Sequence, residues 1–479
     1  MKKKFYITTP IYYVNDKPHI GHAYTTIAAD VLARWHRAQG HDVFFLTGTD
    51  EHGDKVAESA KKQGMGVEEF VEKNAAEFEK TFTNLNIRFD VFMRTTFPEH
   101  NESVQIFMRK LKDAGALYEG VYQGLYCKGC EDFYMEKDLI DGKCPIHNIP
   151  PEIVKEKNWF FKLESYLPRV RELIESGEIA VEPEARKNEV LGLFKQELKD
   201  FSVTRERVRW GLDFLGTGQK IYVWVEALQN YISAVGYGRD EKQFKKWWPA
   251  DVHLMAKDII KFHAIYWPAM LIAAGVETPK KIYAHGFFSL DGKKMSKSLG
   301  NVIDPNDLVK KFGADATRFL LLLQFPFGQD GDIKESKFVE QYNAFLANSI
   351  GNLVSRVATL VEQSGSTLPS RQDLDEKKIL IKRFLKDLPQ EIERMDFNAA
   401  LSTIFTALKN LNEDIARDKP WEMEVGDEGR LSLLRGYVDG ILEVARALEP
   451  FMPETSKAVI HQFTAKKITK GRPLFPRMS

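Results

Sequence analysis

Residues 5–35 read FYITTPIYYVNDKPHIGHAYTTIAADVLARW, and this stretch decides the fold. Residues 5–9 are apolar and rich in β-formers, which predicts a buried strand that stops at Pro10. Beyond residue 22, Ile27, Val31 and Trp35 recur with helical spacing. The string HIGH at residues 19–22 is therefore expected at a turn from a strand into a helix.

Such a turn is where an open α/β sheet binds anions, because the first backbone N–H groups of the helix are unpaired and its dipole favours negative charge. Gly21 lacks a Cβ and lets a flat base approach the backbone, while the imidazoles of His19 and His22 can donate hydrogen bonds to phosphate oxygens. The alternative is that the two histidines are ordinary hydrogen-bonded surface residues near a turn.

A second string, KMSKS at residues 294–298, lies in the polar segment 291–301, which has glycine near both ends. This segment shows no amphipathic stripe and is predicted to be a mobile loop. Lys294 and Lys297 on such a loop can close over a polyphosphate and stabilise the negative charge of a transition state. The alternative is a solvated run of lysines.

Together the two strings resemble the HIGH and KMSKS signatures of class I aminoacyl-tRNA synthetases. Further strings, spread over nearly the whole chain, resemble the methionyl-tRNA synthetases of that class. They are TTPIYYVN (8–15), GTDEHG (48–53), YVWVEA (222–227), KDI (257–259) with FH (262–263), and AHGF (284–287). The resemblance implies that L-methionine and Mg-ATP form methionyl-adenylate and pyrophosphate, and that methionine then passes to the 3′ end of tRNA(Met), initiator and elongator.

The same resemblance implies residue roles. Catalysis falls to His19, His22, Lys294 and Lys297, and Gly21 and Asp258 join them in binding ATP, with Asp258 on the ribose hydroxyls. Positioning and charge stabilisation account for the chemistry, and no dedicated general base is evident.

A set of candidate pocket residues indicates the substrate. Asp50 follows the apolar run 43–46 and is expected at the carboxyl end of a parallel strand, where a carboxylate can hold an α-ammonium. Aromatic side chains on one helical face suit a thioether, although an aromatic stripe can equally be core. With the family's pocket matched position by position, the predicted methionine site is Ile11, Tyr13, Asp50, Trp224, Ala227, Leu228, Tyr231 and His285. Two residues depart from the family pattern: Glu226 where aspartate is frequent, and Ala256 where glycine is common.

All three cysteines fall in one segment, as CKGC at 127–130 and CPIH at 144–147. Three thiolates and an imidazole, Cys127, Cys130, Cys144 and His147, make a valid tetrahedral set for one structural Zn²⁺. Many methionyl enzymes carry a fourth cysteine where this chain has His147. The odd cysteine count disfavours disulfides, and the alternatives are thiols beside a coincidental histidine or a remnant that no longer binds metal.

The expected fold class is α/β: a Rossmann-type parallel sheet with a zinc-knuckle insertion, followed by an all-α bundle. The expected segments are a first catalytic half (1–114), the insertion (115–220), a second catalytic half with the KMSKS loop (221–337) and the bundle (338–479). The insertion is too short for a second, editing site.

In the bundle, Asn348, Asn352 and Arg356 recur every fourth residue, and Trp421 follows Pro420. These four residues match the family's anticodon readers, because amides, a guanidinium and an aromatic ring can read splayed RNA bases. The alternative is an ordinary polar helix face with one buried tryptophan.

Composition is that of an ordinary globular protein, with 43% hydrophobic residues in 479. The 68 basic and 68 acidic residues cancel, so RNA binding would have to use local patches. One candidate patch is the segment 465–479, which has five basic residues and no acid and could equally be a frayed terminus. We expect no membrane-spanning stretch, no signal peptide at the lysine-rich start, a cytoplasmic location and a monomer.

Two rival functions are a small-molecule adenylyl or nucleotidyl transferase, which would not need the helical bundle, and a silent RNA-binding paralogue, which would have lost the two signatures. A cysteinyl-tRNA synthetase is disfavoured, since the first strand carries no cysteine for a zinc at the amino-acid site.

Overall fold

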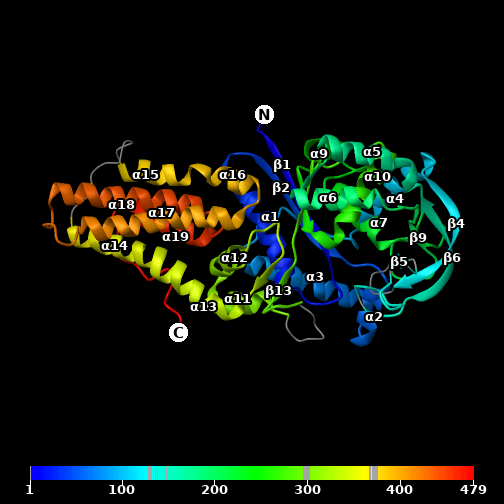
Figure 1. The fold of residues 1–479 in the computed structure, drawn as a ribbon, viewed down its shortest axis with the longest axis horizontal. Helices are drawn as coiled ribbons and strands as arrows, with labels where there is room; N and C mark the ends of the chain where they lie inside the picture. Colours follow the sequence, from blue (N-terminus) through cyan, green and yellow to red (C-terminus); the bar gives the residue numbers. More distant parts are fainter. Residues whose placement is uncertain are drawn as a thin grey trace. The chain divides into compact units, whose positions relative to one another are not determined.

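The computed structural model describes residues 2–127, 132–134, 136, 139–146, 148–294, 302–365, 368 and 376–479. Contacts between residues divide the chain into two compact units (Figure 1). Unit 1 comprises Met1–Pro18, Gln39–Thr83 and Arg88–His285, and unit 2 comprises His19–Ala38, Asn84–Ile87 and Gly286–Ser479. The expected four-segment organisation is a different division and stays a prediction.

Unit 1 is built on a six-stranded sheet in the order β3-β2-β1-β11-β12-β7, and every neighbouring pair is parallel. Its strands are β1 (Lys4–Tyr13), β2 (Asp42–Asp50), β3 (Val91–Arg94), β7 (Ala180–Glu182), β11 (Val252–Ala256) and β12 (Lys281–His285). The expected α/β class with a parallel sheet is confirmed. The central strands β1, β11 and β12 are buried on both faces over most of their length, which explains why they read as apolar runs rather than alternating ones.

The first strand differs from the prediction, because β1 continues through Pro10 to Tyr13. Its pairing with β11 covers Ile7 and Thr8, and its pairing with β2 shifts register between Thr8 and Ile11. Proline lacks an N–H and is tolerated where a strand is irregular or has one neighbour, so Pro10 marks a shift in register rather than an end.

A second sheet of unit 1 has the order β5-β4-β6-β8 and is antiparallel. Its strands are β4 (Leu117–Cys127), β5 (Asp132–Tyr134), β6 (Glu152–Phe161) and β8 (Phe201–Ser202), and a separate pair joins β9 (Thr204–Arg205) to β10 (Lys220–Ile221). These strands, of which β4 and β6 are long and the others short, lie in the segment expected to be an insertion. Within the same segment, however, β7 adds to the parallel sheet beside β12.

The helices of unit 1 surround a hydrophobic core in which Trp267 is fully buried. They are α2 (Asp54–Lys62), α3 (Val67–Asn84), α4 (Pro98–Asp113), α5 (Leu163–Ser176), α6 (Glu184–Leu193), α7 (Val223–Leu228), α8 (Asn230–Ser233), α9 (Glu241–Trp247), the 3-10 turn η2 (Lys257–Ile259), the π-helix η3 (Phe262–Tyr266) and α10 (Trp267–Ala273).

Unit 2 combines helix α1 (Ile20–Ala38) and a small sheet in the order β14-β13-β15 with a set of long helices. The strands are β13 (Phe288–Leu290), β14 (Lys293–Lys294) and β15 (Gly331–Ile333). The helices are α11 (Pro305–Phe312), α12 (Ala314–Leu323), η5 (Glu335–Lys337), α13 (Phe338–Gln341), the π-helix η6 (Tyr342–Gly351), α14 (Asn352–Ser364), α15 (Glu376–Phe384), η7 (Leu385–Asp387), α16 (Leu388–Glu393), α17 (Phe397–Asp418), α18 (Glu428–Leu448) and α19 (Pro453–Thr464).

From Phe338 onward the described secondary structure is entirely helical, as the amphipathic pattern predicts. Helices α11, α17 and α18 each begin after an aspartate, at Asp304, Asp396 and Asp427. In each case the carboxylate accepts a backbone N–H of the first turn, which satisfies one of the donors that a helix start leaves without a partner.

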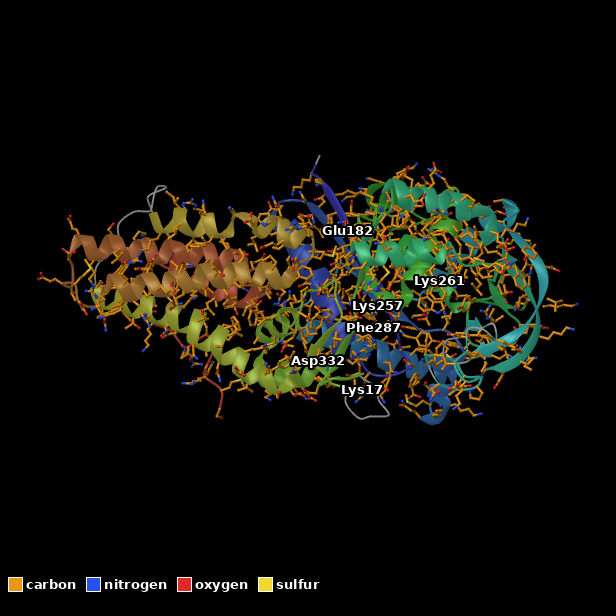
Figure 2. All side chains as sticks on the ribbon, viewed as in Figure 1. Lys17, Glu182, Lys257, Lys261, Phe287 and Asp332 are labelled. Atoms are coloured by element: carbon orange, nitrogen blue, oxygen red, sulfur yellow. The ribbon has the colours of Figure 1, made fainter. Side chains whose placement is uncertain are left out.

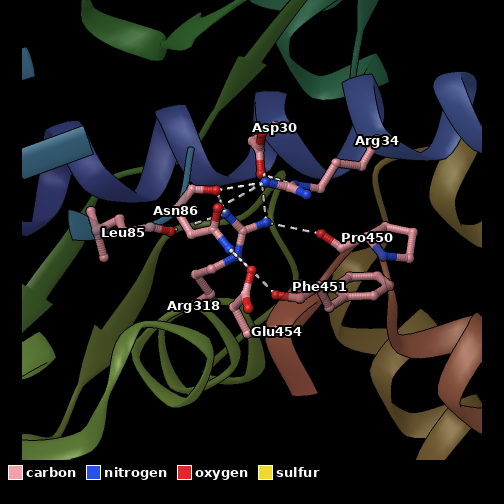
Figure 3. A network of polar contacts seen from close by, with 8 residues as sticks. All are labelled: Asp30, Arg34, Leu85, Asn86, Arg318, Pro450, Phe451 and Glu454. Atoms are coloured by element: carbon pink, nitrogen blue, oxygen red, sulfur yellow. Dashed lines mark hydrogen bonds and ion pairs between the residues drawn. The ribbon is translucent and has the colours of Figure 1, made fainter. Parts of the chain in front are cut away.

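A buried ionic cluster joins the elements of unit 2 (Figure 3). Arg318 of α12 and Asp30 of α1 are both 0% exposed, and their Nη2 and Oδ2 atoms lie 2.7 Å apart. Arg318 also donates to the carbonyl oxygens of Phe451 (2.8 Å), Pro450 (2.9 Å), Leu85 (3.3 Å) and Asn86 (3.4 Å). Asp30 also accepts from Nε of Arg34 at 2.7 Å. Asp30 thus balances the charge of Arg318, and backbone carbonyls accept from its N–H groups. A buried ion pair is tolerated when both conditions are met.

Within the described residues, one helical stretch, Glu335–Ser364, is long and apolar enough to cross a membrane by length and composition. The expectation that no stretch has this length and composition is therefore wrong. Half of its most apolar window is buried inside the protein, and the core helix of a globular protein passes the same test.

Candidate functional site

The HIGH turn of unit 2 forms a reciprocal cap on helix α1. His19 precedes the helix, and its Nδ1 accepts the N–H of Gly21 at 3.0 Å. Nδ1 of His22 in turn accepts the N–H of His19 at 3.1 Å, and the two rings stack with centroids 3.8 Å apart. This pattern is that of a capping box, with imidazoles in place of the usual serine and glutamate.

These hydrogen bonds correct one part of the sequence reasoning. The first N–H groups of α1 were expected to be unpaired, yet that of Ile20 donates to the carbonyl of Ile303, and those of His22 and Ala23 donate to the carbonyl of His19. Because each Nδ1 is an acceptor, a neutral ring carries its proton on Nε2. In the neutral form each ring therefore has its N–H at Nε2, and anion binding by these two rings stays a prediction.

The KMSKS segment lies partly outside the described residues. Asp291 and Gly292 have φ values of 49° and 73°, and they join β13 to β14 as a tight hairpin. Asp-Gly with two positive φ angles is the preferred two-residue hairpin turn. The described part of the expected mobile loop, residues 291–294, is thus a hairpin turn that places Lys294 in β14. The rest of the loop, residues 295–301 with Lys297, lies outside the described residues.

In unit 1, predicted methionine and ATP residues gather at the carboxyl edge of the parallel sheet. Ile11 pairs with Gly48 and Tyr13 with Asp50 across β1 and β2, and His285 ends β12 opposite Ala256 of β11. Asp258 follows β11 in η2, on the helical stretch where Figure 2 labels Lys257 and Lys261. This edge is where α/β sheets bind ligands.

Asp50 and His285 are buried, Ile11 and Tyr13 are half-buried, and Asp258 is exposed. Gly48 beside Asp50 is required by close packing, because a Cβ there would lie 1.9 Å from the carbonyl oxygen of Met93. The sheet thus brings these predicted residues to one edge.

The aromatic residues expected on one helical face are divided between α7 and α8. Trp224 of α7 is half-buried and stacks on Phe262, with ring centroids 4.2 Å apart and planes 7° from parallel. Ala227 and Leu228 of α7 are 5% and 3% exposed, and Tyr231 of α8 is 1% exposed. Trp224 therefore presents one ring face to Phe262, and the other three contribute to the packed interior.

His263 belongs to the same cluster and was absent from the predicted site. The hydroxyl of Tyr231 lies 2.7 Å from Nε2 of His263, whose Nδ1 lies 3.0 Å from the carbonyl oxygen of Ile259. Since a carbonyl can only accept, Nδ1 carries the proton and Tyr231 donates to Nε2. Burial lowers the pKa of His263 to about 4, so the ring is neutral at pH 7. The FH string at 262–263 was the signal that could have identified it.

Two of the four predicted zinc ligands, Cys127 and Cys144, lie within the described residues. Cys127 ends β4 and is fully buried. Cys144 is 1% exposed, and its carbonyl oxygen accepts the N–H of Asn148. Cys130 and His147 lie outside the described residues. Among the residues that are described, no group of three or more histidine, cysteine or acidic side chains is placed to hold a metal. Two buried cysteines in this segment fit zinc ligation, and the full ligand set stays a prediction.

The predicted anticodon residues occupy η6, α14 and the segment after α17. Asn348 and Asn352 are exposed, and Arg356 is half-buried. Trp421 is 47% exposed, so the alternative of a buried core tryptophan does not apply. The guanidinium of Arg356 lies 5.9 Å from the centroid of the Trp421 ring, which places a cation beside an exposed aromatic face.

The basic C-terminal segment is not frayed. Asn343 donates to the carbonyl of Met478 (2.8 Å) and accepts the N–H of Met478 (2.9 Å), while the ring of Phe475 contacts that of Tyr342 at 5.9 Å. The N–H of Lys470 donates to Glu362 at 3.1 Å. Lys466, Lys467, Lys470, Arg472 and Arg477 are exposed, and RNA binding by them stays a prediction.

Comparisons with known proteins show the family to which the chain is similar. The model of the family "tRNA synthetases class I (M)" matches residues 5–149 and 135–358. A methionine–tRNA ligase of Caldanaerobacter subterraneus subsp. tengcongensis is 40% identical over 509 residues, covering 100% of this chain and 79% of the relative. The methionine–tRNA ligase of Thermotoga maritima is 42% identical over 473 residues, covering 96% of this chain and 75% of the relative.

Among solved structures, the methionyl-tRNA synthetase of Mycobacterium tuberculosis in complex with methionyl-adenylate matches with a TM-score of 0.93. It is 33% identical, and the match covers 99% of this chain and 100% of that one. The same enzyme in its apo form matches with a TM-score of 0.86 at 30% identity.

Proposed function

The chain belongs to the class I tRNA synthetases of the methionine group, and we propose that it joins L-methionine to tRNA(Met) in two steps. The observation that carries the proposal is the histidine turn at the start of α1, whose two Nε2 hydrogens suit phosphate oxygens. It stands in a chain that resembles methionine–tRNA ligases over its full length.

In the first step a carboxylate oxygen of methionine attacks the α-phosphorus of ATP, and the bond from that phosphorus to the bridging oxygen breaks. Pyrophosphate leaves, and methionyl-adenylate forms without a covalent enzyme intermediate. Mg²⁺ accompanies ATP and neutralises phosphate charge. His19 and His22 donate to the transferring and departing phosphates, and Lys294 and Lys297 add positive charge as pyrophosphate forms. Gly21 lets the adenine approach the backbone, and Asp258 binds the ribose hydroxyls.

Methionine is held by groups of unit 1. The carboxylate of Asp50 binds the α-ammonium, and Ile11, Tyr13, Trp224 and the other predicted pocket residues enclose the side chain. The structure supports this role for Trp224, because its ring is fixed by stacking on Phe262 and a fixed aromatic edge favours contact with sulfur. Ala227, Leu228, Tyr231 and His285 are buried around the same elements.

In the second step a terminal ribose hydroxyl of tRNA attacks the carbonyl carbon of the adenylate. The aminoacyl ester forms, AMP leaves, and the hydroxyl proton is released. Asn348, Asn352, Arg356 and Trp421 read the anticodon of initiator and elongator tRNA(Met). The exposure of both amides and of the Trp421 ring supports this role.

Zinc is proposed as a structural ion held by Cys127, Cys130, Cys144 and His147. When bound, it cross-links two turns of a segment that has little core of its own. We also propose a monomer that works in the cytoplasm.

The test is ATP–pyrophosphate exchange without tRNA, with each of the twenty amino acids offered separately. Exchange with methionine alone is expected. Exchange with a different amino acid would overturn the assignment of methionine as the substrate. Absence of exchange with every amino acid would favour a tRNA-dependent enzyme or a silent paralogue.

A further inference from the structure

A buried histidine–glutamate pair lies in the interior of unit 1. Nδ1 of His52 and Oε1 of Glu226 are 2.7 Å apart, and the two side chains are 6% and 0% exposed. His52 lies in the loop that follows β2, and Glu226 lies in α7. The pair therefore connects two elements that are 174 residues apart in the sequence.

The loop that carries His52 is fixed on its other sides. The buried carboxylate of Glu51 accepts from Arg94 (2.7 Å), Thr49 (2.7 Å) and Thr96 (2.6 Å). Nε1 of Trp210 donates to the carbonyl of Glu51 at 2.6 Å, and the N–H of Gly53 donates to the carbonyl of Trp210 at 3.0 Å. His52 is thus a rigid point of attachment for α7.

Helix α7 needs such an attachment. It spans six residues, too few for a helix to be stable by its own hydrogen bonds, and no side chain caps its start. Its orientation must come from tertiary contacts. Glu226 supplies a directional contact, because a charged hydrogen bond fixes an angle as well as a distance.

The charges of the pair are mutually dependent. Burial raises the pKa of Glu226 against the opposing effect of His52. Burial lowers the pKa of His52, but the carboxylates of Glu226 and Glu51 together raise it, and the net direction is upward. Oε2 of Glu226 is buried and has no hydrogen-bond partner among the described residues, so His52 carries the stabilisation of this carboxylate. The other charged or titratable groups that act on the pair are Glu51, Lys220 and His100.

The pair lies two residues from Asp50 on one side and two residues from Trp224 on the other. We propose that His52 and Glu226 are positioning residues that set the affinity for methionine by holding Asp50 and Trp224 at a fixed separation. This inference rests on the proposed function, in which Asp50 binds the α-ammonium and Trp224 the side chain.

The test compares His52→Asn, Glu226→Gln and the double variant in ATP–pyrophosphate exchange. Both substitutions keep the approximate shape and remove a charge. Each single variant should raise the KM for methionine about tenfold while the KM for ATP and kcat stay within about twofold of the unmodified protein. The double variant should resemble the single variants rather than multiply their effects, because both remove one interaction.

Lys280→Gln is the control. It breaks an ion pair of unit 1, Lys280 with Asp251 at 2.7 Å, that involves neither α7 nor the loop after β2. The KM for methionine should not change in this variant.

A methionine KM within about twofold of normal in folded variants would overturn the proposal, and so would equal increases in the KM for both substrates. If Glu226→Gln does not fold, Glu226→Asp keeps the charge and shortens its reach by one methylene. An unchanged methionine KM in that variant would equally overturn it. Absence of methionine-dependent exchange in the unmodified protein would instead contradict the proposed function.

Discussion

At the scale of single residues, each histidine of the HIGH turn uses its two ring nitrogens for different roles. Nδ1 of each ring accepts a backbone N–H at the start of α1, and this fixes the direction in which Nε2 points. A donor held in place before the reaction needs little reorganisation as charge develops, which is how preorganised electrostatic stabilisation lowers a barrier.

Lys297→Ala tests the lysine half of the same chemistry. Loss of one donor to a developing oxyanion typically lowers a rate about 100- to 1,000-fold, so pyrophosphate exchange should fall by that factor. The KM for methionine should stay near its normal value. Unchanged exchange would remove Lys297 from the catalytic set.

His263 makes the stability of unit 1 depend on pH. Its folded-state pKa of about 4 lies below the ordinary value of 6.5, so its contribution to stability is complete above about pH 6.5 and is lost as the pH falls toward 4. His263→Gln keeps a donor and an acceptor but cannot titrate. Between pH 7.5 and pH 5 the variant should lose about 2 kcal/mol less free energy of unfolding than the unmodified protein. Urea denaturation at the two pH values measures this, and equal losses would contradict the assignment.

The residue types of the site could be predicted from the sequence, but their hydrogen bonds could not. HIGH indicated the turn correctly, whereas the satisfied N–H groups of α1 depend on the rotamers of two imidazoles and on the carbonyl of Ile303 far along the chain. His263 was missed for the same reason, because its role follows from its contact with Tyr231, which lies 32 residues earlier in the chain on a different helix.

At the scale of elements, the Arg318 cluster decides how α1 is held within unit 2. Arg318→Met removes the guanidinium and leaves four backbone carbonyls and Asp30 short of a partner. Breaking a buried pair from one side typically costs about 3–5 kcal/mol, and a loss of that size is expected in the free energy of unfolding.

Arg446→Met is the control for that variant, since Arg446 forms a helix-surface pair with Glu443 at 2.9 Å and is 47% exposed. Its loss should cost less than about 1 kcal/mol. Similar effects of the two substitutions would show that the Arg318 cluster contributes no more than a surface pair.

Trp421→Ala tests the helical elements that are proposed to read tRNA. Stacking of a base on an aromatic ring is worth about 1–3 kcal/mol, so the KM for tRNA should rise about 5- to 150-fold. Exchange in the absence of tRNA should be unaffected. Equal damage to both reactions would point to misfolding.

Elements with a strong periodic pattern were predictable, and short ones were not. Helix α1 and the helices after Phe338 follow from their apolar spacing. Strand β7 has three residues and β14 has two, too few for any period, so their places in a sheet are fixed by neighbours distant in sequence. Pro10 was read as a strand end because the sequence cannot show that β1 shifts register there.

At the scale of the whole molecule, the zinc proposal has a direct test. The purified protein should contain about one zinc ion per chain, and Cys144→Ser should lower that content because a thiolate ligand is lost. Metal analysis by atomic absorption measures both. Absence of zinc in protein purified without chelators would refute the ligand set.

The division of the chain into two units limits how it can be dissected. The backbone passes from one unit to the other five times, at 18/19, 38/39, 83/84, 87/88 and 285/286. A fragment that starts at Gly286 would keep Arg318 but lose Asp30, Leu85 and Asn86, and a guanidinium built to be buried would have lost its counter-charge. Binding studies on an isolated helical segment would therefore require residues 19–38 and 84–87 to be supplied with it, because unit 2 is assembled from three separate stretches of the chain.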